Sequence, residues 1–197
     1  MTSLDDAVAV LAAGGVVVFP TESVYGLGAD ATSAAAVDRL VAVRGREPGK
    51  PILVLASDVA MVTAAARDVS PLARRLAERL WPGALTLVLP ARDDLPAALT
   101  AGTGTIGVRV PAHATACALV ARFGRPVTAP SANPPGEPPA ETVDAARAYF
   151  GAGVGAYVDG GLCDGAPSTV VAVDGDAIRI VREGRIDAAT IRRAAEA

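Results

Sequence analysis

Residues 16–28, with the sequence VVVFPTESVYGLG, combine a short apolar run with a polar segment that contains two glycines. The apolar run 16–19 ends at Pro20 and is typical of a short buried strand. Residues 21–28 are predicted to form a loop rather than a helix or an ordinary strand. Because α/β proteins place ligand-contacting residues in loops directly after buried strands, we expect this loop to contact a ligand.

Strands and helices alternate on both sides of this stretch, which indicates an α/β fold. Ser3 is expected to cap a first helix, which Gly14 and Gly15 end. Residues 174–176 (DGD) separate two apolar runs as in a hairpin, which favours a mixed rather than an all-parallel sheet. Residues 90–105 are expected to be irregular. Further helices are expected at 33–43, 58–66, 71–80, 113–123, 142–149 and 188–195, and further strands at 52–55, 85–89, 106–110, 127–129, 169–173 and 177–181.

Composition excludes several classes of protein. The 197 residues are 51% hydrophobic, and 18 Lys and Arg against 21 Asp and Glu give a net charge of −3, which excludes a disordered chain. This length predicts one domain, and the acidic balance argues against a non-specific nucleic-acid binder. Cys117, Cys163 and the single histidine, His113, lack the spacing of a zinc site. No run approaches the roughly 20 apolar residues of a membrane span, and no basic leader opens the chain, so we expect a soluble cytoplasmic protein.

A glycine pattern at residues 102–107 (GTGTIG) matches the dinucleotide-binding fingerprint in its letters only. That fingerprint needs a strand before it and a helix after it, whereas an irregular stretch precedes this pattern and a strand follows it. The phosphate-binding pattern G-x-x-x-x-G-K-[ST] is absent from the sequence. A site for ATP would therefore be built in another way.

Five polar segments follow or interrupt the apolar strands, namely 21–28, 44–50, 103–109, 129–133, and Ser168 together with Arg182. Each alone has an ordinary explanation, as a capped turn, a solvated charge run or an exposed strand edge. Together they hold several cations, several hydroxyls and one asparagine, but no nucleophile–base pair. His113 is as compatible with a capping or surface role as with catalysis, and Cys163 has no neighbouring base. This inventory favours phosphoryl or nucleotidyl transfer, in which catalysis is mostly positioning and charge stabilisation.

Several of these segments form motifs that follow one another in a fixed order. They are FPTESVYGLG at 19–28, RGR at 44–46 with Lys50 and Pro51, WPGALT at 81–86, GVRVP at 107–111 with His113, APSAN at 129–133 with Gly136, DGG at 159–161, STV at 168–170, and Arg182 with Gly184. In these motifs the chain resembles the YrdC/Sua5 family of threonylcarbamoyl-AMP synthases, over residues 14–186. With a helical tail at 187–197, residues 1–197 are expected to form a single YrdC-like domain of the short type, without the C-terminal domain of the longer Sua5 form.

This resemblance implies a twisted, mixed open sheet with surrounding helices and a large concave basic cavity. It implies that L-threonine, bicarbonate and ATP react to give threonylcarbamoyl-AMP and pyrophosphate, the first step of N6-threonylcarbamoyladenosine synthesis in tRNA. The product would pass to a separate tRNA threonylcarbamoyltransferase, so tRNA binding by this chain is expected to be weak or indirect. No tightly bound organic cofactor is implied, and Mg²⁺ would be held mainly by the ATP phosphates.

The resemblance also implies roles for individual residues. Arg109 would bind the threonine carboxylate, because a guanidinium can donate two parallel hydrogen bonds to a carboxylate. Arg44 and Arg46 would be the catalytic residues, which stabilise the charge that develops on the phosphates. Ser23 and Ser168 would contact the threonine, and the backbone at Leu55 and Ala129 would shape its pocket. The ATP site would contain Arg46, Lys50, Thr105, Ser131, Asn133 and Arg182.

Four positions depart from the family pattern. Arg44 stands where the family has Lys, Glu47 and Glu183 stand where Pro is usual, and Pro135 replaces a common Ser. We expect both glutamates to point to solvent. Gly45, Gly49 and the basic residues of the segment 44–51 suggest the hypothesis that it closes as a lid, which the sequence does not decide. The substitution at Arg44 leaves open an alternative, a YciO-like paralogue that binds nucleotide or double-stranded RNA without synthase activity. A carbamoyl-adenylating module of hydrogenase maturation proteins is a third reading, although such modules belong to much longer chains.

Overall fold

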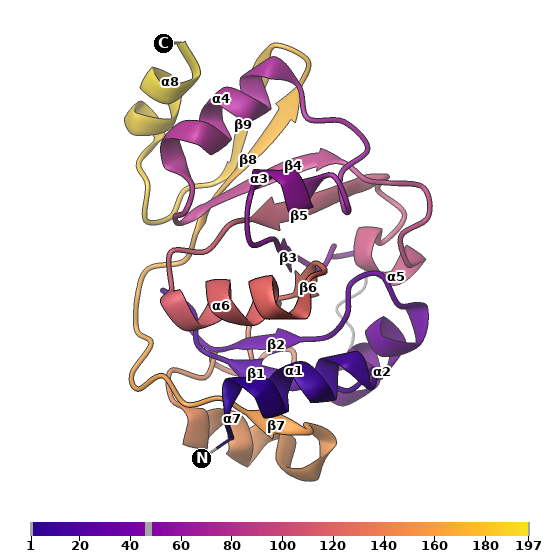
Figure 1. Cartoon of the computed structure of the whole chain (residues 1–197). Helices are drawn as coiled ribbons and strands as arrows, with labels where there is room; N and C mark the ends of the chain where they lie inside the picture. The colour runs from indigo at the N-terminus through magenta and orange to yellow at the C-terminus, as the bar shows by residue number, and fades with distance from the viewer. Residues whose placement is uncertain (1, 46–48, 197) are drawn as a thin grey trace.

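In the computed structural model, which describes residues 2–45 and 49–196, the strands form two open sheets (Figure 1). The smaller sheet has the order β2-β1-β7 and contains β1 (Val17–Phe19), β2 (Gly26–Gly28) and β7 (Ala156–Tyr157). The larger has the order β6-β3-β5-β4-β8-β9 and contains β3 (Val54–Leu55), β4 (Leu85–Pro90), β5 (Thr105–Arg109), β6 (Val127–Thr128), β8 (Thr169–Asp174) and β9 (Ala177–Arg182). Both sheets mix parallel and antiparallel pairs, which confirms the predicted mixed open sheet.

The two sheets meet edge to edge at β2 and β6. The backbone N–H of Leu27 donates to the carbonyl of Pro130 at 2.9 Å, and that of Thr128 donates to the carbonyl of Ala29 at 3.0 Å. Gly26 also forms a single bridge with Ser131. These bonds place the polar loop after β6 directly beside the polar segment after β1, although about a hundred residues separate the two along the chain.

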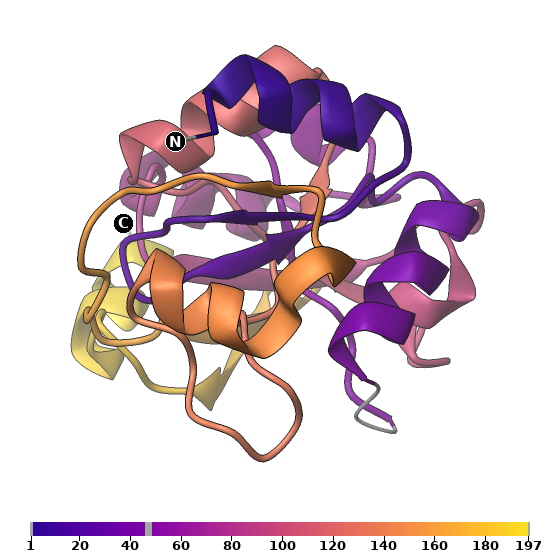
Figure 2. The same cartoon turned by 90° about the horizontal axis from the view of Figure 1, so that it is seen from below.

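Helices cover both sheets. The helices α1 (Leu4–Ala12) and α6 (Ala114–Phe123) pack side by side on one face of the smaller sheet, and α7 (Val143–Phe150) covers its other face (Figure 2). The larger sheet carries α4 (Pro71–Leu80), which packs against α8 (Ala188–Glu196). The remaining helices are α2 (Ala34–Arg44), α3 (Val59–Val62), α5 (Ala97–Thr100) and the 3₁₀ turn η1 (Gly151–Gly153). In the part of the chain that the structure describes, no helix has the length and apolar character needed to cross a membrane.

The helix starts follow from the sequence. Ser3 and Asp6 form a capping box, in which the Ser3 hydroxyl accepts from the Asp6 N–H and the Asp6 carboxylate accepts from the Ser3 N–H. Ser70 caps α4 and Pro71 occupies its first turn, so the helix begins at the predicted residue. These caps satisfy backbone donors that have no partner within the helix.

Three predicted elements were wrong in type or length. Residues 26–28, expected to belong to a loop, form strand β2, because their glycines let the backbone pass close to β1: a Cβ at Gly28 would lie 2.8 Å from Val17 Cγ2. The stretch 90–105, expected to be irregular, contains the short helix α5. The helix expected at 58–66 is limited to Val59–Val62, because Ala66 instead bridges to Ala91 beside the end of β4.

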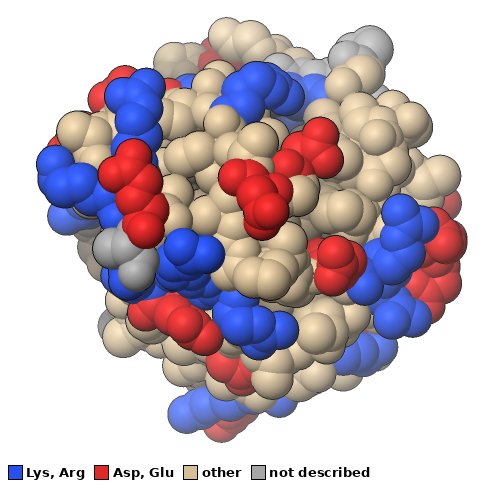
Figure 3. All heavy atoms as spheres, turned by 90° about the horizontal axis from the view of Figure 1, so that it is seen from above, with Lys and Arg blue, Asp and Glu red and all other residues tan. Residues whose placement is uncertain are grey.

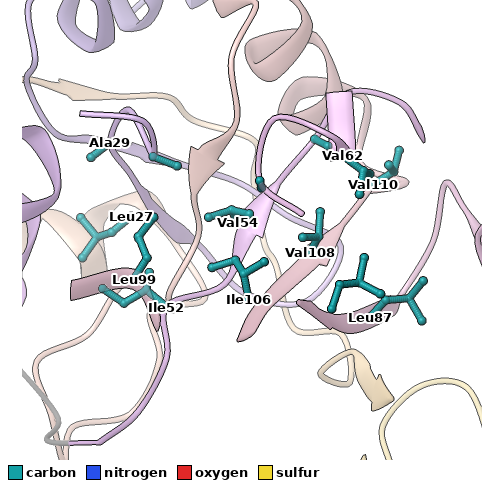
Figure 4. Packing of buried hydrophobic residues seen from close by; sticks show 14 of the residues in the cluster. Leu27, Ala29, Ile52, Val54, Val62, Leu87, Leu99, Ile106, Val108 and Val110 are labelled. Carbon is teal, nitrogen blue, oxygen red and sulfur yellow. The ribbon is translucent and has the colours of Figure 1, made fainter. Parts of the chain in front are cut away.

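One aliphatic core links the two sheets (Figure 4). Val54, Val108 and Leu87 are direct cross-strand partners on β3, β5 and β4, and Leu27 on β2 belongs to the same buried cluster. Burial of a Val or Leu side chain stabilises the folded state by about 1.5–3 kcal/mol. Because side chains alternate along a strand, the neighbours of Val108 and Leu87 point to the opposite face of the larger sheet.

Candidate functional site

A cavity of about 760 Å³ lies on that opposite face, near the junction of the two sheets. Every second residue of the strands faces it: Thr86 and Val88 on β4, Gly107 and Arg109 on β5. Its wall includes five cations, and no Asp or Glu of the described residues lines it, so the cavity is electropositive. The five cations are Arg44, Lys50, Arg109, Arg179 and Arg182.

Arg109 ends β5 and is only 3% exposed. Its backbone carbonyl accepts from the Ala56 N–H at 3.0 Å, and Leu55 is its register partner on β3. Burial lowers the Arg109 pKa, the nearby Glu22 carboxylate raises it, and the Arg182 charge lowers it further. Among the described residues, Arg109 Nε has no hydrogen-bond partner. A buried guanidinium with a free donor is suited to bind a carboxylate.

Four hydroxyl groups line the same cavity as Arg109. Ser23 and Thr21 are buried with their hydroxyl oxygens 3.3 Å apart, and Ser168 and Thr86 share a hydrogen bond of 2.8 Å. Hydroxyls both donate and accept, so such a wall can bind the polar groups of a small amino acid.

A β-bulge brings Arg182 to the cavity. On β9, Ile180 pairs with Val171 and Arg182 pairs with Val170, so Val181 is an extra residue in the ladder. Bulges re-aim the side chains next to them, and here both Val181 and Arg182 line the cavity. Arg182 Nη2 donates to the Ser168 carbonyl at 2.8 Å, which fixes the guanidinium beside the hydroxyl pair.

The cations expected at the phosphates come from the end of α2 and the segment after it. Arg44 Nε donates to the Ser131 carbonyl at 3.1 Å, and Lys50 also lines the cavity. A lysine at position 44 would carry one compact ammonium group, whereas the guanidinium is a planar group with donors on three nitrogens. Arg46 and Glu47, with the middle of the expected lid, lie outside the described residues.

Most of the predicted site residues come together, although they belong to separate segments. The residues that line the cavity are Ser23, Arg44, Lys50, Thr105, Arg109, Ala129, Ser131, Ser168 and Arg182. Leu55 does not line it, because its side chain is fully buried in the smaller core cluster under α6 and its backbone pairs with Arg109. Asn133 does not line it either, because its amide donates to the Pro134 and Glu137 carbonyls at 3.0 and 2.7 Å and so shapes its own loop.

The sequence analysis assigned no site role to five further polar lining residues, Thr21, Tyr25, Thr86, Thr103 and Arg179. Thr86 could have been found, since a buried threonine in an apolar strand signals a polar contact on one face. The position of Arg179 depends on its strand facing the cavity, which no local pattern reveals. Glu183 is exposed, as expected, and its carboxylate accepts from the Ala188 N–H at 3.1 Å at the start of α8.

The described residues contain no group of three or more His, Cys, Asp or Glu side chains that could hold a metal ion. The charged side chains of the cavity wall are the cations of Arg and Lys, which bind anions. The arrangement as a whole fits a ligand with a carboxylate at Arg109 and further negative charge toward Arg44 and Lys50.

Comparison with known proteins agrees with this geometry. The Sua5/YciO/YrdC family model, described as telomere recombination, matches residues 9–184. The threonylcarbamoyl-AMP synthase of Thiobacillus denitrificans is 43% identical over 152 residues, which are 77% of this chain and 80% of that protein.

Solved structures agree as well. A crystal structure of Sua5 from Pyrococcus abyssi complexed with L-threonine has a TM-score of 0.92 and 34% identity, over 97% of this chain and 56% of that one. The crystal structure of Escherichia coli YciO has a TM-score of 0.84 and 28% identity, over 95% and 92% of the two chains. The chain thus spans about half the length of the Pyrococcus abyssi protein, and 47% of the curated threonylcarbamoyl-AMP synthase from that organism.

Proposed function

The chain belongs to the Sua5/YciO/YrdC family, and from this membership we propose that it is a threonylcarbamoyl-AMP synthase. The reaction would join L-threonine, bicarbonate and ATP and release pyrophosphate. The observation that carries the proposal is Arg109, a buried arginine with an unused donor, in a cavity whose wall also includes Arg44, Lys50, Arg179 and Arg182. One cavity can then bind an amino acid and a nucleotide side by side.

Threonine would bind at the Arg109 end of the cavity. Its carboxylate would accept hydrogen bonds from the Arg109 guanidinium, which offers a planar pair of donors. Ser23, Ser168 and Thr86 supply hydroxyls for its amino and hydroxyl groups, and Ala129 leaves room for its methyl group. This pocket favours threonine over serine by the burial of one methyl group, about 1–3 kcal/mol.

ATP would bind toward Arg44, with Lys50, Thr105, Ser131 and Arg182 around it. The threonine amine first captures the bicarbonate carbon and loses water, which gives a carbamate. A carbamate oxygen then attacks the α-phosphorus in line, the new O–P bond forms, and the bond to the bridging oxygen breaks with release of pyrophosphate. Arg44 and Lys50 would neutralise the charge that builds up on the phosphate oxygens, with Arg46 assigned the same role from the sequence alone.

Mg²⁺ would bind to the phosphates of ATP and supply further charge neutralisation there. The residues of the cavity wall fit this arrangement, because they include no carboxylate among the described residues that would hold the ion apart from the nucleotide. The class of enzyme would then be a nucleotidyltransferase, with no organic cofactor in its reaction.

The later transfer to tRNA is assigned to a separate transferase. A net charge of −3 gives the protein no general attraction to a polyanion. On the face over α4 and α8, Lys and Arg side chains are interspersed with Asp and Glu side chains (Figure 3). Contact with tRNA would therefore be weak or indirect, and the function belongs in the cytoplasm, where ATP, threonine and tRNA are available together.

Pyrophosphate release tests the proposal. The purified protein is given ATP, Mg²⁺ and bicarbonate, with L-threonine, with L-serine or with no amino acid. Release that requires both L-threonine and bicarbonate is expected. If folded protein releases no pyrophosphate in response to threonine, the proposal fails and a YciO-like binding role takes its place.

A further inference from the structure

A second cavity, of about 450 Å³, lies behind the segment that contains Thr21, Glu22 and Ser23. Its lining includes Glu22 and His113, whereas Arg109 lines the first cavity. Thr21 lines both cavities, so the wall between them is thin at this point. Glu22 and Arg109 therefore approach each other from opposite sides of one wall.

The pair of charges in this wall has an unusual geometry. Arg109 Nη1 and Glu22 Oε1 are 3.6 Å apart, beyond hydrogen-bond distance, and the two side chains are only 4% and 10% exposed. Among the described residues, neither Glu22 oxygen accepts a hydrogen bond, and Arg109 Nε donates none. The contact is thus one of charge alone, inside the protein, where solvent screens it weakly.

This distance has a chemical consequence. A carboxylate at about 2.8 Å would take up guanidinium donors and compete with a substrate carboxylate for them. At 3.6 Å, Glu22 balances the Arg109 charge and leaves the donors free. Without that balance, Arg109 would be a buried cation that faces only the like charge of Arg182.

The backbone around Glu22 is held in place by the loop at 160–168. Gly165 N–H donates to the Ser23 carbonyl at 3.0 Å, and a Cβ at Gly165 would lie only 2.1 Å from the Glu22 carbonyl oxygen. The loop therefore passes directly over residues 22 and 23. These backbone contacts hold the main chain at residue 22 in place, whichever side chain this residue carries.

We propose that Glu22 is a positioning residue for Arg109: its carboxylate, placed behind the guanidinium and out of hydrogen-bond reach, keeps Arg109 aimed at the first cavity with its donors free for the carboxylate of the amino-acid substrate. This inference rests on the proposed function for the identity of that substrate. It makes Glu22 a determinant of amino-acid affinity, although it lines the other cavity.

Kinetics of matched variants test the proposal. Glu22→Gln keeps the size of the side chain and removes its charge, so the KM for threonine should rise about tenfold while the KM for ATP changes less than about twofold. Glu22→Asp keeps the charge and should restore most of the threonine affinity. In an Arg109→Lys background, where the aimed guanidinium is already lost, Glu22→Gln should change the threonine KM much less.

Asp30→Asn is the matched control, because Asp30 is a buried carboxylate paired with Arg125 at 2.6 Å and lines neither cavity. It should lower the unfolding temperature and leave the threonine KM unchanged. If Glu22→Gln behaves in the same way as Asp30→Asn, Glu22 is structural and the proposal is overturned.

A spectroscopic measurement separates this inference from the proposed function. The side-chain Nε–H signal of Arg109, assigned by its loss in Arg109→Lys, should shift in Glu22→Gln and stay in place in Asp30→Asn. If the wild-type protein releases no pyrophosphate but this signal shifts, only the substrate assignment fails. A signal that is the same in Glu22→Gln and wild type would refute the positioning role.

Discussion

Arg109 is the residue on which the amino-acid half of the proposed site depends. Arg109→Lys keeps the charge but replaces the planar fork with a point charge, so we expect threonine affinity to fall about 10- to 100-fold. Calorimetric titration with threonine in the presence of a non-hydrolysable ATP analogue measures this. Arg122→Lys, at an exposed ion pair with Asp5, is the control and should bind threonine as wild type does.

His113 makes stability depend on pH. Burial lowers the His113 pKa from its ordinary 6.5, and the Glu22 charge only partly opposes this. As the pH falls below 6.5, the unfolded chain takes up a proton at His113 that the folded chain does not, so the free energy of unfolding decreases. The unfolding temperature of wild type should therefore drop more between pH 7.5 and pH 5.5 than that of His113→Gln. Equal drops in the two proteins would show that His113 is not the group responsible.

At the scale of elements, the loop at 160–168 is held against the site by close backbone contact. A Cβ at Gly165 would lie 2.1 Å from the Glu22 carbonyl oxygen, which a side chain cannot relieve by rotating. Gly165→Ala should therefore displace the loop, lower stability by about 1–3 kcal/mol and reduce activity at least tenfold. Gly153→Ala, whose Cβ would meet Val43 at an ordinary 3.5 Å, is the control for denaturant unfolding and pyrophosphate assays. A Gly165→Ala protein with wild-type activity would contradict this account of the loop.

Elements that depend on local patterns could be predicted from the sequence, and those that depend on partners far along the chain could not. Ser3, Ser70 and Pro71 mark their helices by capping chemistry within four residues. Strand β2 was missed because its glycines are typical of a turn, and only the packing against Phe19 and Val17 makes them suitable for a strand. The bulge at Val181 depends on the register with β8, which no local pattern contains.

Across the whole molecule, the larger of the two core clusters includes residues of both sheets. Leu87 on β4 is fully buried between Val108 and Val171, on the face opposite to the cavity. Leu87→Ala should lower the free energy of unfolding by about 2–5 kcal/mol. Leu162→Ala, at a side chain that is 64% exposed, should change it by less than about 0.5 kcal/mol. Denaturant unfolding compares the two, and a cost at Leu87 no larger than at Leu162 would contradict the proposed core.

The site was predictable only in part, because some of its features depend on the assembled fold. The motifs indicated which segments would contribute, and nine of the assigned residues line one cavity. The sequence did not reveal that the Asn133 amide nitrogen would donate within its own loop, or that Glu22 would line the second cavity, 3.6 Å from Arg109. Both depend on how the two sheets meet, which is a property of the assembled fold.

The most direct test of the central claim is to follow labelled substrates into one product. Protein is incubated with radiolabelled bicarbonate, with ATP labelled at the α-phosphate, and with L-threonine, and the products are separated. One product should carry both labels, should form only when threonine is present, and should be strongly reduced in Arg109→Lys. Two results would contradict the proposed synthase reaction: an adenylate that lacks the bicarbonate carbon, or the formation of ADP instead of pyrophosphate.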